Sequence, residues 1–284
     1  MIHKPAESVS PALRWMRAGL RSLSRISPEL AARLALEIFL TPLGQPKVTR
    51  GQPVLDIAIH LKISFEDKQL TGYQWGDGSQ TVLLVHGWRA SAGSMSAFVE
   101  PLTACGFRVV AFDAPAHRKS PGRQLDLIRY SDAIRAVLHQ FEPIQGIVAH
   151  SMGASAATLA LVKMARIPIE RLVLVSVPQS LKGSVHGFAA LLGLDEQTKA
   201  ALFALLQKRY GGAISAFNMV DAVTELEIAG LVVHDRDDGI VPFADGEAIA
   251  TAWEEGSFLV TEGLGHNNLL RDAETVTEVC DFLC

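Results

Sequence analysis

The sequence predicts an α/β fold in which a mostly parallel sheet of eight strands carries helices on both faces. The main observation is a rhythm of short apolar runs that alternate with helical patterns after residue 80. Two strands of alternating pattern precede these runs, and one long helix-like stretch interrupts them. The apolar runs are TVLLVH (81–86), FRVVAF (107–112), IQGIVA (144–149), RLVLVS (171–176), GLVVH (230–234) and SFLVT (257–261).

The chain has 284 residues, 49% of them hydrophobic, which is enough for one large α/β domain with an insertion. We expect four segments along it. They are an N-terminal helical segment (1–50), the first part of the core (51–177), a helical cap insertion (178–226) and the second part of the core (227–284).

The N-terminal segment is expected to form two helices, each begun by a Ser-Pro pair, because serine caps a helix and proline suits its first position. The pairs are Ser10-Pro11 and Ser27-Pro28, and TPLG (41–44) ends the second helix. The first helix has an apolar and a basic face, formed by Leu13, Met16, Leu20 and Leu23 and by Arg14, Arg17, Arg21 and Arg25. We expect it to pack on the main domain, with membrane contact through residues 1–45 as the alternative.

The net charge of −4 is unevenly distributed along the sequence. Residues 1–50 contain 8 Lys and Arg against 3 Asp and Glu, a net charge of +5, so the other residues carry −9. Only the first segment is therefore basic. No nucleic-acid partner is predicted.

After the N-terminal segment, the spacing of apolar residues changes from a helical to a strand-like period. Alternating apolar residues from Val54 to Phe65 predict an edge or antiparallel strand, and a second strand through Tyr73 and Trp75 ends at GDG (76–78). In the insertion, GFAALLG (187–193) and residues 198–210 are helix-like, so a helical cap is expected there.

Several classes of protein and site are not favoured by the sequence. No apolar run approaches the roughly 20 residues that cross a bilayer, and no secretory signal pattern opens the sequence, so a cytoplasmic protein is expected. Cys105, Cys280 and Cys284 lack the spacing of a zinc site or a disulfide framework, and reduced thiols are expected. The nine histidines show no H-E-x-x-H spacing, and neither a metal site nor a cofactor is predicted.

The stretch AHSMG (149–153) lies where a predicted buried strand ends and a helix begins. It resembles the nucleophile elbow of the α/β-hydrolase superfamily, of the esterase and lipase-like branch, in which a tight turn exposes a serine hydroxyl. The resemblance implies the α/β-hydrolase fold, with Ser151 as the nucleophile. Ala149 takes the place of the first glycine of G-x-S-x-G, which is a modest departure.

A serine nucleophile needs a base and an acid, and in this family they follow it in the order acid, then histidine. HDRDDGIVP (234–242) and GLGHNN (263–268) follow the last two predicted strands. The ending D-x-I-V-P resembles the acid loop of the family and implies Asp238 as the acid, with Asp235 and Asp237 as rivals. His266 is implied as the base.

The tetrahedral intermediate of acyl transfer needs two backbone N–H donors for its oxyanion. The resemblance implies Met152, which follows the nucleophile, and Trp88 in HGWR (86–89), which is similar to the H-G-x loop of the family. Trp88, His150 and His186 are expected to line the substrate pocket. His150 and His234 are expected to pack or hydrogen-bond beside the site.

A further family-like segment is FDAPAHRKS (112–120), which resembles D-x-P-G-H-G-x-S. Ala116 and Arg118 replace its usual glycines, which puts the turn geometry of this loop in question. No residue of the implied triad is lost by these replacements.

The resemblance covers roughly residues 54–284 and implies a serine hydrolase that cleaves a carboxylic ester or thioester of a small to medium acyl substrate through an acyl-serine intermediate. Alternatives are a serine-triad peroxidase, amidase or carbon–carbon hydrolase, and a catalytically silent ligand-binding protein that keeps the pocket. A further alternative is an interfacial lipase whose N-terminal helices contact lipid. Acyl and alcohol specificity and the oligomeric state are left open by the sequence.

Overall fold

The computed structural model describes residues 11–47, 49–166, 169–212 and 214–284. The chain divides into two compact units, which are Met1–Leu40 with Leu181–Ala216, and Thr41–Ser180 with Phe217–Cys284. The two N-terminal helices and residues 181–216 of the expected cap insertion belong to one unit, and the four expected segments stay a prediction. The chain returns to the larger unit at Phe217.

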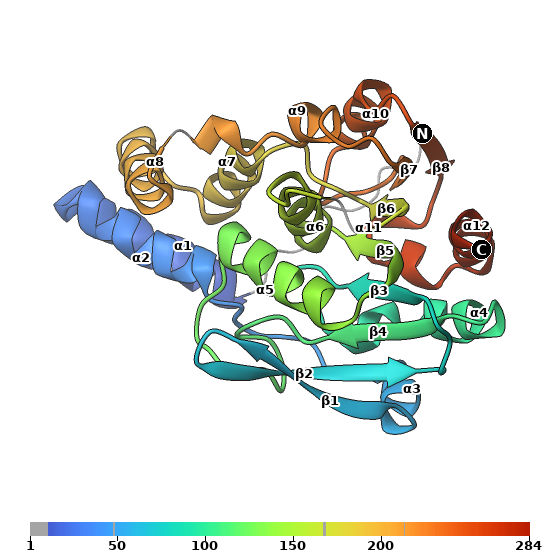
Figure 1. Ribbon diagram of the computed structural model, residues 1–284. Helices are drawn as coiled ribbons and strands as arrows, with labels where there is room; N and C mark the ends of the chain where they lie inside the picture. The colour runs from blue at the N-terminus through green and yellow to red at the C-terminus, as the bar shows by residue number, and fades with distance from the viewer. Residues whose placement is uncertain (1–10, 48, 167–168, 213) are drawn as a thin grey trace. The chain divides into compact units, whose positions relative to one another are not determined.

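The larger unit contains the sheet, and its eight strands follow the order β1-β2-β4-β3-β5-β6-β7-β8 (Figure 1). Strand β1 pairs antiparallel with β2, β2 pairs antiparallel with β4, and all other neighbours are parallel. The predicted eight-stranded, mostly parallel sheet is thus confirmed. The strands are β1 (Ile59–Phe65), β2 (Lys68–Trp75), β3 (Thr81–Val85), β4 (Arg108–Phe112), β5 (Ile144–His150), β6 (Arg171–Val175), β7 (Ala229–Asp235) and β8 (Gly256–Thr261).

Helices cover both faces of this sheet. Helices α5 and α6 pack together on one face, and η1, α4 and α12 pack on the other. The helices of this unit are α3 (Gln52–Asp56), η1 (Ala92–Phe98), α4 (Val99–Ala104), α5 (Leu127–Gln140), α6 (Met152–Val162), α9 (Met219–Val223), α10 (Phe243–Ala252), α11 (Gly265–Asn268), η3 (Leu269–Arg271) and α12 (Ala273–Leu283).

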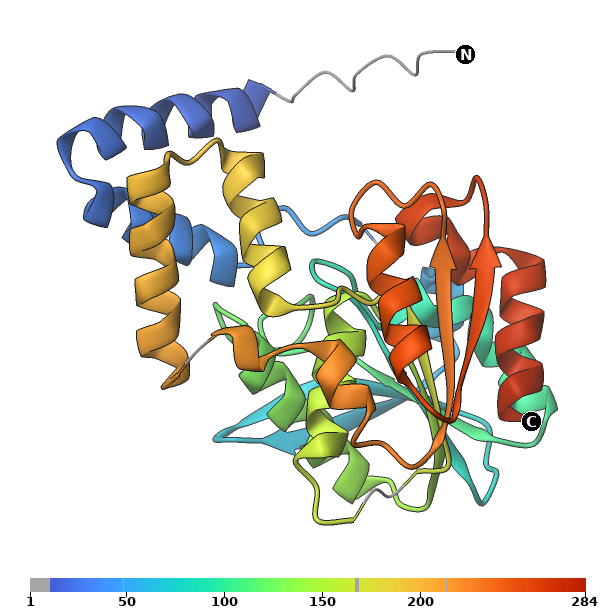
Figure 2. The ribbon, with the colours of Figure 1, turned by 90° about the horizontal axis from the view of Figure 1, so that it is seen from above.

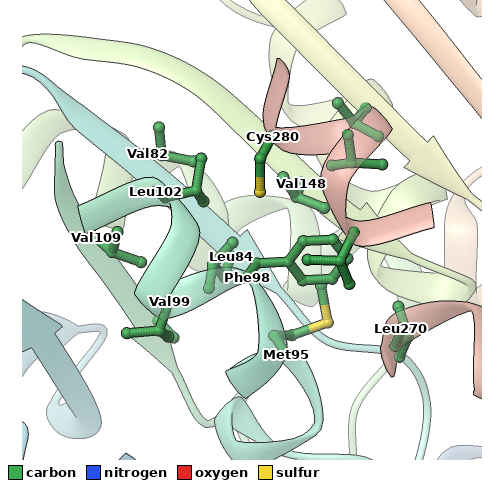
Figure 3. Close-up of a cluster of buried hydrophobic side chains, with 14 of the residues drawn as sticks. Val82, Leu84, Met95, Phe98, Val99, Leu102, Val109, Val148, Leu270 and Cys280 are labelled. Atoms are coloured by element: carbon green, nitrogen blue, oxygen red, sulfur yellow. The ribbon is translucent and has the colours of Figure 1, made fainter. Parts of the chain in front are cut away.

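A buried apolar cluster fills the space between the sheet and the second group of helices (Figure 3). Val82, Leu84 and Val109 contribute from the strands, and Phe98 and Leu102 pack on them from η1 and α4. Burial of apolar surface stabilises the fold by about 25 cal/mol per Å². The cluster therefore holds in place the strands whose carboxyl ends carry the candidate site.

The predicted strand from Val54 to Phe65 is only partly correct, because its first residues form α3 and the strand starts at Ile59. Pro53 lies in the first turn of α3, where proline is well accommodated. Leu55 is buried in the apolar cluster while Ile57 is exposed, and the Trp75 indole N–H donates to the Val54 carbonyl over 2.8 Å. In α3 one side chain, that of Leu55, is therefore buried, and the alternation of buried and exposed residues that a strand would show is absent there.

The smaller unit is helical (Figure 2). Helix α1 packs on α2 and α7, and α2 packs on α8. The Ser27 hydroxyl accepts the Leu30 N–H over 3.2 Å as a cap of α2, whereas the expected cap Ser10 lies outside the described residues. The helices are α1 (Pro11–Ile26), α2 (Pro28–Leu40), α7 (Leu181–Leu192), α8 (Glu196–Tyr210) and η2 (Ile214–Ala216).

Polar and aromatic contacts tie the helices of the smaller unit together. The Ser24 hydroxyl donates to the Asp195 carboxylate and accepts from the Thr198 hydroxyl, which joins α1 to the start of α8. The rings of Phe39 and Phe188 meet edge to face with centroids 5.0 Å apart. Within the described ranges, no helix combines the length and apolarity that crossing a bilayer requires.

The cysteines do not follow the expectation of reduced thiols. Cys105, which follows α4, and Cys284, which follows α12, form a disulfide, while Cys280 is free and buried. The prediction was wrong because the two residues are 179 positions apart, and only the packing of α12 beside α4 brings them together. Disulfides are more typical of oxidising compartments than of the cytoplasm, and the cytoplasmic location stays a prediction.

Candidate active site

Ser151 occupies a strained turn between β5 and α6. Its backbone has φ 54° and ψ −125°, a conformation that is costly for any residue with a Cβ. The turn is held by the Ser151 N–H, which donates to the Val175 carbonyl over 2.9 Å, and by the Ser151 carbonyl, which accepts from Ala154 over 2.9 Å. This geometry places the serine side chain beyond the carboxyl end of β5.

Two glycines allow the neighbouring chain segments to approach the turn. A Cβ on Gly153 would lie 2.3 Å from the His86 carbonyl oxygen, and one on Gly87 would lie 2.8 Å from His150 Nδ1. Both positions therefore exclude larger residues. Ala149 is different, because it lies within β5 between Val85 and Leu174, and alanine is accommodated there without strain.

The structure brings Ser151, His266 and Asp238, the three residues that the resemblance implied, within hydrogen-bonding distance of one another. His266, in α11 after β8, has Nε2 3.1 Å from Ser151 Oγ and Nδ1 2.8 Å from Asp238 Oδ2. The side chain of Asp238 is fully buried, and that of His266 is 8% exposed. The three residues follow β5, β7 and β8, so they meet at the carboxyl edge of the sheet.

Asp238 is held in place by its own loop. Its Oδ1 accepts the N–H groups of Ile240 and Val241 over 2.8 and 2.9 Å, which leaves Oδ2 to His266. Burial acts to raise the pKa of Asp238, but the hydrogen bonds from His266 and from these two N–H groups outweigh it and lower the pKa to about 2. The carboxylate is therefore ionised at neutral pH.

Histidines surround the triad on two sides. His150 Nε2 lies 3.0 Å from the His266 carbonyl oxygen, to which it donates, and the two rings are 4.7 Å apart. Burial lowers the pKa of His150 to about 3, so its imidazole is neutral. His234 Nε2 lies 3.5 Å from Asp238 Oδ2 and 3.2 Å from the Val241 carbonyl oxygen.

Asp235 has a function in the site that the sequence did not distinguish from that of its neighbours. Its buried carboxylate accepts the N–H groups of Asp237, Leu264 and Gly265 over 2.9, 3.0 and 2.9 Å, together with the Thr261 hydroxyl over 2.7 Å. It thereby holds the loop that carries His266. The signal available in the sequence was its position directly after the apolar run GLVVH (230–234), at the end of a predicted strand.

Asp237 is exposed and, within the described part of the chain, accepts a single bond, from the Gly263 N–H over 3.0 Å. Of the three candidate acids, the structure thus places Asp238 on His266 and turns the other two towards backbone amides.

The two expected oxyanion donors lie on either side of the elbow. Met152 is the first residue of α6, so its N–H has no acceptor within the helix. Trp88 follows Gly87 in the loop after β3, and among the described residues its N–H has no hydrogen-bond partner. Their role as donors stays a prediction.

The loop of Trp88 is fixed by a pair of neutral histidines. His86 accepts the Ala114 N–H at Nε2 over 3.0 Å, and its Nδ1 therefore donates to the Gly87 carbonyl over 2.7 Å. His117 Nε2 accepts the Arg89 N–H over 3.0 Å, and its ring meets the Trp88 indole edge to face at 5.4 Å. Burial lowers the pKa of His86 to about 4 and that of His117 to about 3.

The loop after β4 has positive φ angles at the two positions where the family has glycines. Ala116 and Arg118 adopt φ 63° and 48°, the left-handed region that favours glycine. The Gln45 side chain holds both, since its amide donates to the Ala116 carbonyl over 3.0 Å and accepts the Arg118 N–H over 2.8 Å.

Two further expectations concern the pocket and metals. His186 lies on α7 in the smaller unit, where its ring is 4.8 Å from that of Phe203, and its place in a substrate pocket stays a prediction. In the part of the chain that the structure describes, no group of three or more His, Cys, Asp or Glu side chains is arranged to hold a metal ion.

Comparison with known proteins decides the family. The model of the alpha/beta hydrolase family matches residues 82–279. The chain belongs to this family. A bifunctional esterase/perhydrolase of Acinetobacter calcoaceticus is 25% identical to this α/β-hydrolase over 256 residues, which cover 72% of this chain and 91% of that protein.

Solved structures share the fold of this α/β-hydrolase. An esterase of Pyrococcus furiosus superposes with a TM-score of 0.63 at 20% identity, covering 86% of this chain and 95% of its own. A bromoperoxidase of Bacillus anthracis has a TM-score of 0.62 at 18% identity, covering 79% and 99% of the two chains. At these identities the similarity shows the fold.

Proposed function

We propose that this α/β-hydrolase is a serine hydrolase that cleaves a carboxylic ester or thioester of a small to medium acyl substrate. The observation that carries the proposal is the chain of contacts from Ser151 Oγ to His266 and from His266 to Asp238, over 3.1 and 2.8 Å. The esterase activity of the Acinetobacter relative supports an acyl substrate.

In the first half of the reaction, Ser151 Oγ attacks the acyl carbon while His266 Nε2 takes the hydroxyl proton. The negative charge moves to the carbonyl oxygen, which accepts the N–H groups of Met152 and Trp88. Asp238 holds His266 Nδ1–H and stabilises the imidazolium. Collapse of the intermediate expels the alcohol or thiol, which takes the proton from His266, and leaves an acyl-Ser151 ester.

In the second half, water attacks the acyl ester and gives its proton to His266, and Ser151 leaves with that proton as the acid product departs. Hydrogen peroxide in place of water would give a peracid by the same steps. This second outcome is considered because the Acinetobacter relative is named a perhydrolase as well as an esterase.

The experiment begins with a fluorophosphonate probe on the purified full-length protein, with Ser151→Ala as the matched control. We expect labelling of the wild-type protein at Ser151 alone, and none of the control. p-Nitrophenyl esters of increasing chain length and acyl-CoA thioesters then define the substrate, with hydrogen peroxide added in a parallel series to measure peracid.

The Ser151→Ala variant should lower kcat on the best ester by about 10⁶-fold, as comparable triad replacements do. Near-wild-type turnover by this variant would overturn the mechanism. A protein that neither reacts with the probe nor turns over any ester would instead be a ligand-binding protein with an idle triad.

A further inference from the structure

Helix α1 has an outward face that differs from the face packed inside the smaller unit. Its inward residues Leu20 and Ser24 are buried, whereas Trp15 and Ile26 are 79% and 80% exposed. Trp15 and Ile26 are eleven positions apart, about three helical turns, so they lie on one line along the helix. Ser22, two turns after Trp15 and one turn before Ile26, lies between them on the same line and is exposed as well.

A strip of cations runs beside this line. Arg14, Arg21 and Arg25 follow the same spacing one position earlier, so they form a parallel row along the helix. All three are exposed, and their side chains form no ion pair or hydrogen bond with any other described residue. The sequence of α1, PALRWMRAGLRSLSRI, contains no acidic residue that could neutralise them.

The remainder of the smaller unit does not offset this charge. In residues 11–40 and 181–216 there are nine Lys and Arg against four Asp and Glu, although the chain as a whole has a net charge of −4. The unit is therefore basic on an otherwise acidic protein. Such an asymmetry directs the basic part towards an anionic surface.

We propose that the outward face of α1, formed by Arg14, Trp15, Arg21, Arg25 and Ile26, binds the surface of an anionic lipid bilayer. An indole is suited to the headgroup level of a bilayer, because its ring is apolar and its N–H is polar. Arginines beside it pair with lipid phosphates, and the isoleucine enters the acyl boundary. In this arrangement the axis of α1 lies along the membrane surface.

Charge and shape favour a bilayer over other occupants. A second copy of this chain would have to offer an acidic surface with a recess for an exposed indole. A bilayer needs neither, because it supplies anionic headgroups along the whole row and yields to side chains that project from a straight helix. The proposal concerns a surface and does not depend on the reaction at Ser151.

The test uses full-length protein and vesicles of phosphatidylcholine, with or without phosphatidylglycerol, in a flotation assay. We expect flotation with the anionic vesicles and little with pure phosphatidylcholine, and release at high salt. Trp15 is far more exposed than Trp75 and Trp253, which are buried. Because the Trp15 indole moves from water into the bilayer, the tryptophan fluorescence emission should shift to the blue on binding. The Trp15→Phe variant should show a much smaller shift.

Two variants separate the parts of the surface. Arg14→Gln, Arg21→Gln and Arg25→Gln together should weaken binding by about 100-fold, on the usual contribution of each cation near an anionic membrane. The matched control removes three exposed cations of the larger unit, through Lys62→Gln, Arg123→Gln and Lys163→Gln, and should bind like the wild type.

The second variant, Trp15→Ala with Ile26→Ser, removes two exposed apolar side chains without changing the charge. It should weaken vesicle binding by about tenfold. Circular dichroism checks that the helices persist. Absence of flotation by the wild-type protein, or equal loss in the Lys62, Arg123 and Lys163 control, would overturn the proposal. A wild-type dimer in light scattering that this variant dissociates, without vesicle binding, would assign the face to a second copy.

Discussion

Asp235 offers the sharpest test of how the site is assembled. Its carboxylate accepts two N–H groups at Oδ1, and one N–H group and a hydroxyl at Oδ2. These bonds hold the start of α11 and hence His266. Asp235→Asn keeps the size of the side chain but leaves only one oxygen, and its NH₂ group then faces an N–H donor.

The magnitude follows from the number of bonds that the amide loses. If the remaining oxygen keeps the N–H groups of Asp237 and Gly265, the N–H of Leu264 loses its acceptor, while the Thr261 hydroxyl rotates to accept from the new NH₂. Losing one charge-assisted bond and burying its donor costs about 3 kcal/mol. A loop displaced by about 1 Å would also lower kcat by roughly 10²-fold, because His266 no longer meets Ser151 well.

Urea unfolding followed by circular dichroism gives the stability, and ester turnover gives kcat. Asp237→Asn is the matched control, because Asp237 is exposed and accepts only the Gly263 N–H, and it should change stability by less than about 1 kcal/mol. An Asp235→Asn variant within about 0.5 kcal/mol of the wild type, with unchanged kcat, would refute the assigned role of this carboxylate.

Three further predictions follow from the geometry of the larger unit. Asp238→Asn should lower kcat by about 10⁴-fold, because the amide stabilises the wrong tautomer of His266; a loss no greater than that of Asp237→Asn would move the acid elsewhere. The lowered pKa of Asp238 means that its contribution to stability is complete above about pH 4 and lost as pH falls towards about 2, so urea unfolding of Asp238→Asn should depend less on pH in this window than that of the wild type. Cys284→Ser should lower stability by up to about 5 kcal/mol, since the disulfide to Cys105 closes a loop of 179 positions, and reductant should lower the melting temperature of the wild type but not of the variant.

The strand rhythm and the order of polar residues at strand ends were readable from the sequence, and together they located the site. Ser151, Asp238 and His266 each follow an apolar run that proved to be a strand, β5, β7 or β8. Because parallel strands have their carboxyl ends at one edge, residues far apart in the chain must meet there. Local periodicity thus determined where chemistry gathers.

The choice among neighbouring acids needed the tertiary structure. Asp235, Asp237 and Asp238 lie within four positions and have the same chemistry, so no local pattern separates them. The turn after β7 decides, because the N–H groups of Ile240 and Val241 take Oδ1 of Asp238 and leave its Oδ2 to His266. Which carboxylate reaches His266 therefore depends on the path of that turn.

The strained backbone of the loop after β4 is likewise held by a residue from another segment. Ala116 and Arg118 prefer other conformations by their own chemistry, and yet they adopt positive φ because Gln45, some 70 positions earlier, hydrogen-bonds both of them. A glycine pattern describes what a turn accepts most easily, whereas tertiary contacts determine what it tolerates.

The sequence by itself determined the fold class, the eight strands, the two N-terminal helices and the chain order of the site residues, because all of these follow from the period and punctuation of neighbouring residues. Only the tertiary structure decided that the N-terminal helices and the insertion form one unit, that Asp235 holds the His266 loop, and that Cys105 pairs with Cys284. Each of these depends on which surfaces bury one another, and a contact between residues 30 to 179 positions apart leaves no period in either segment.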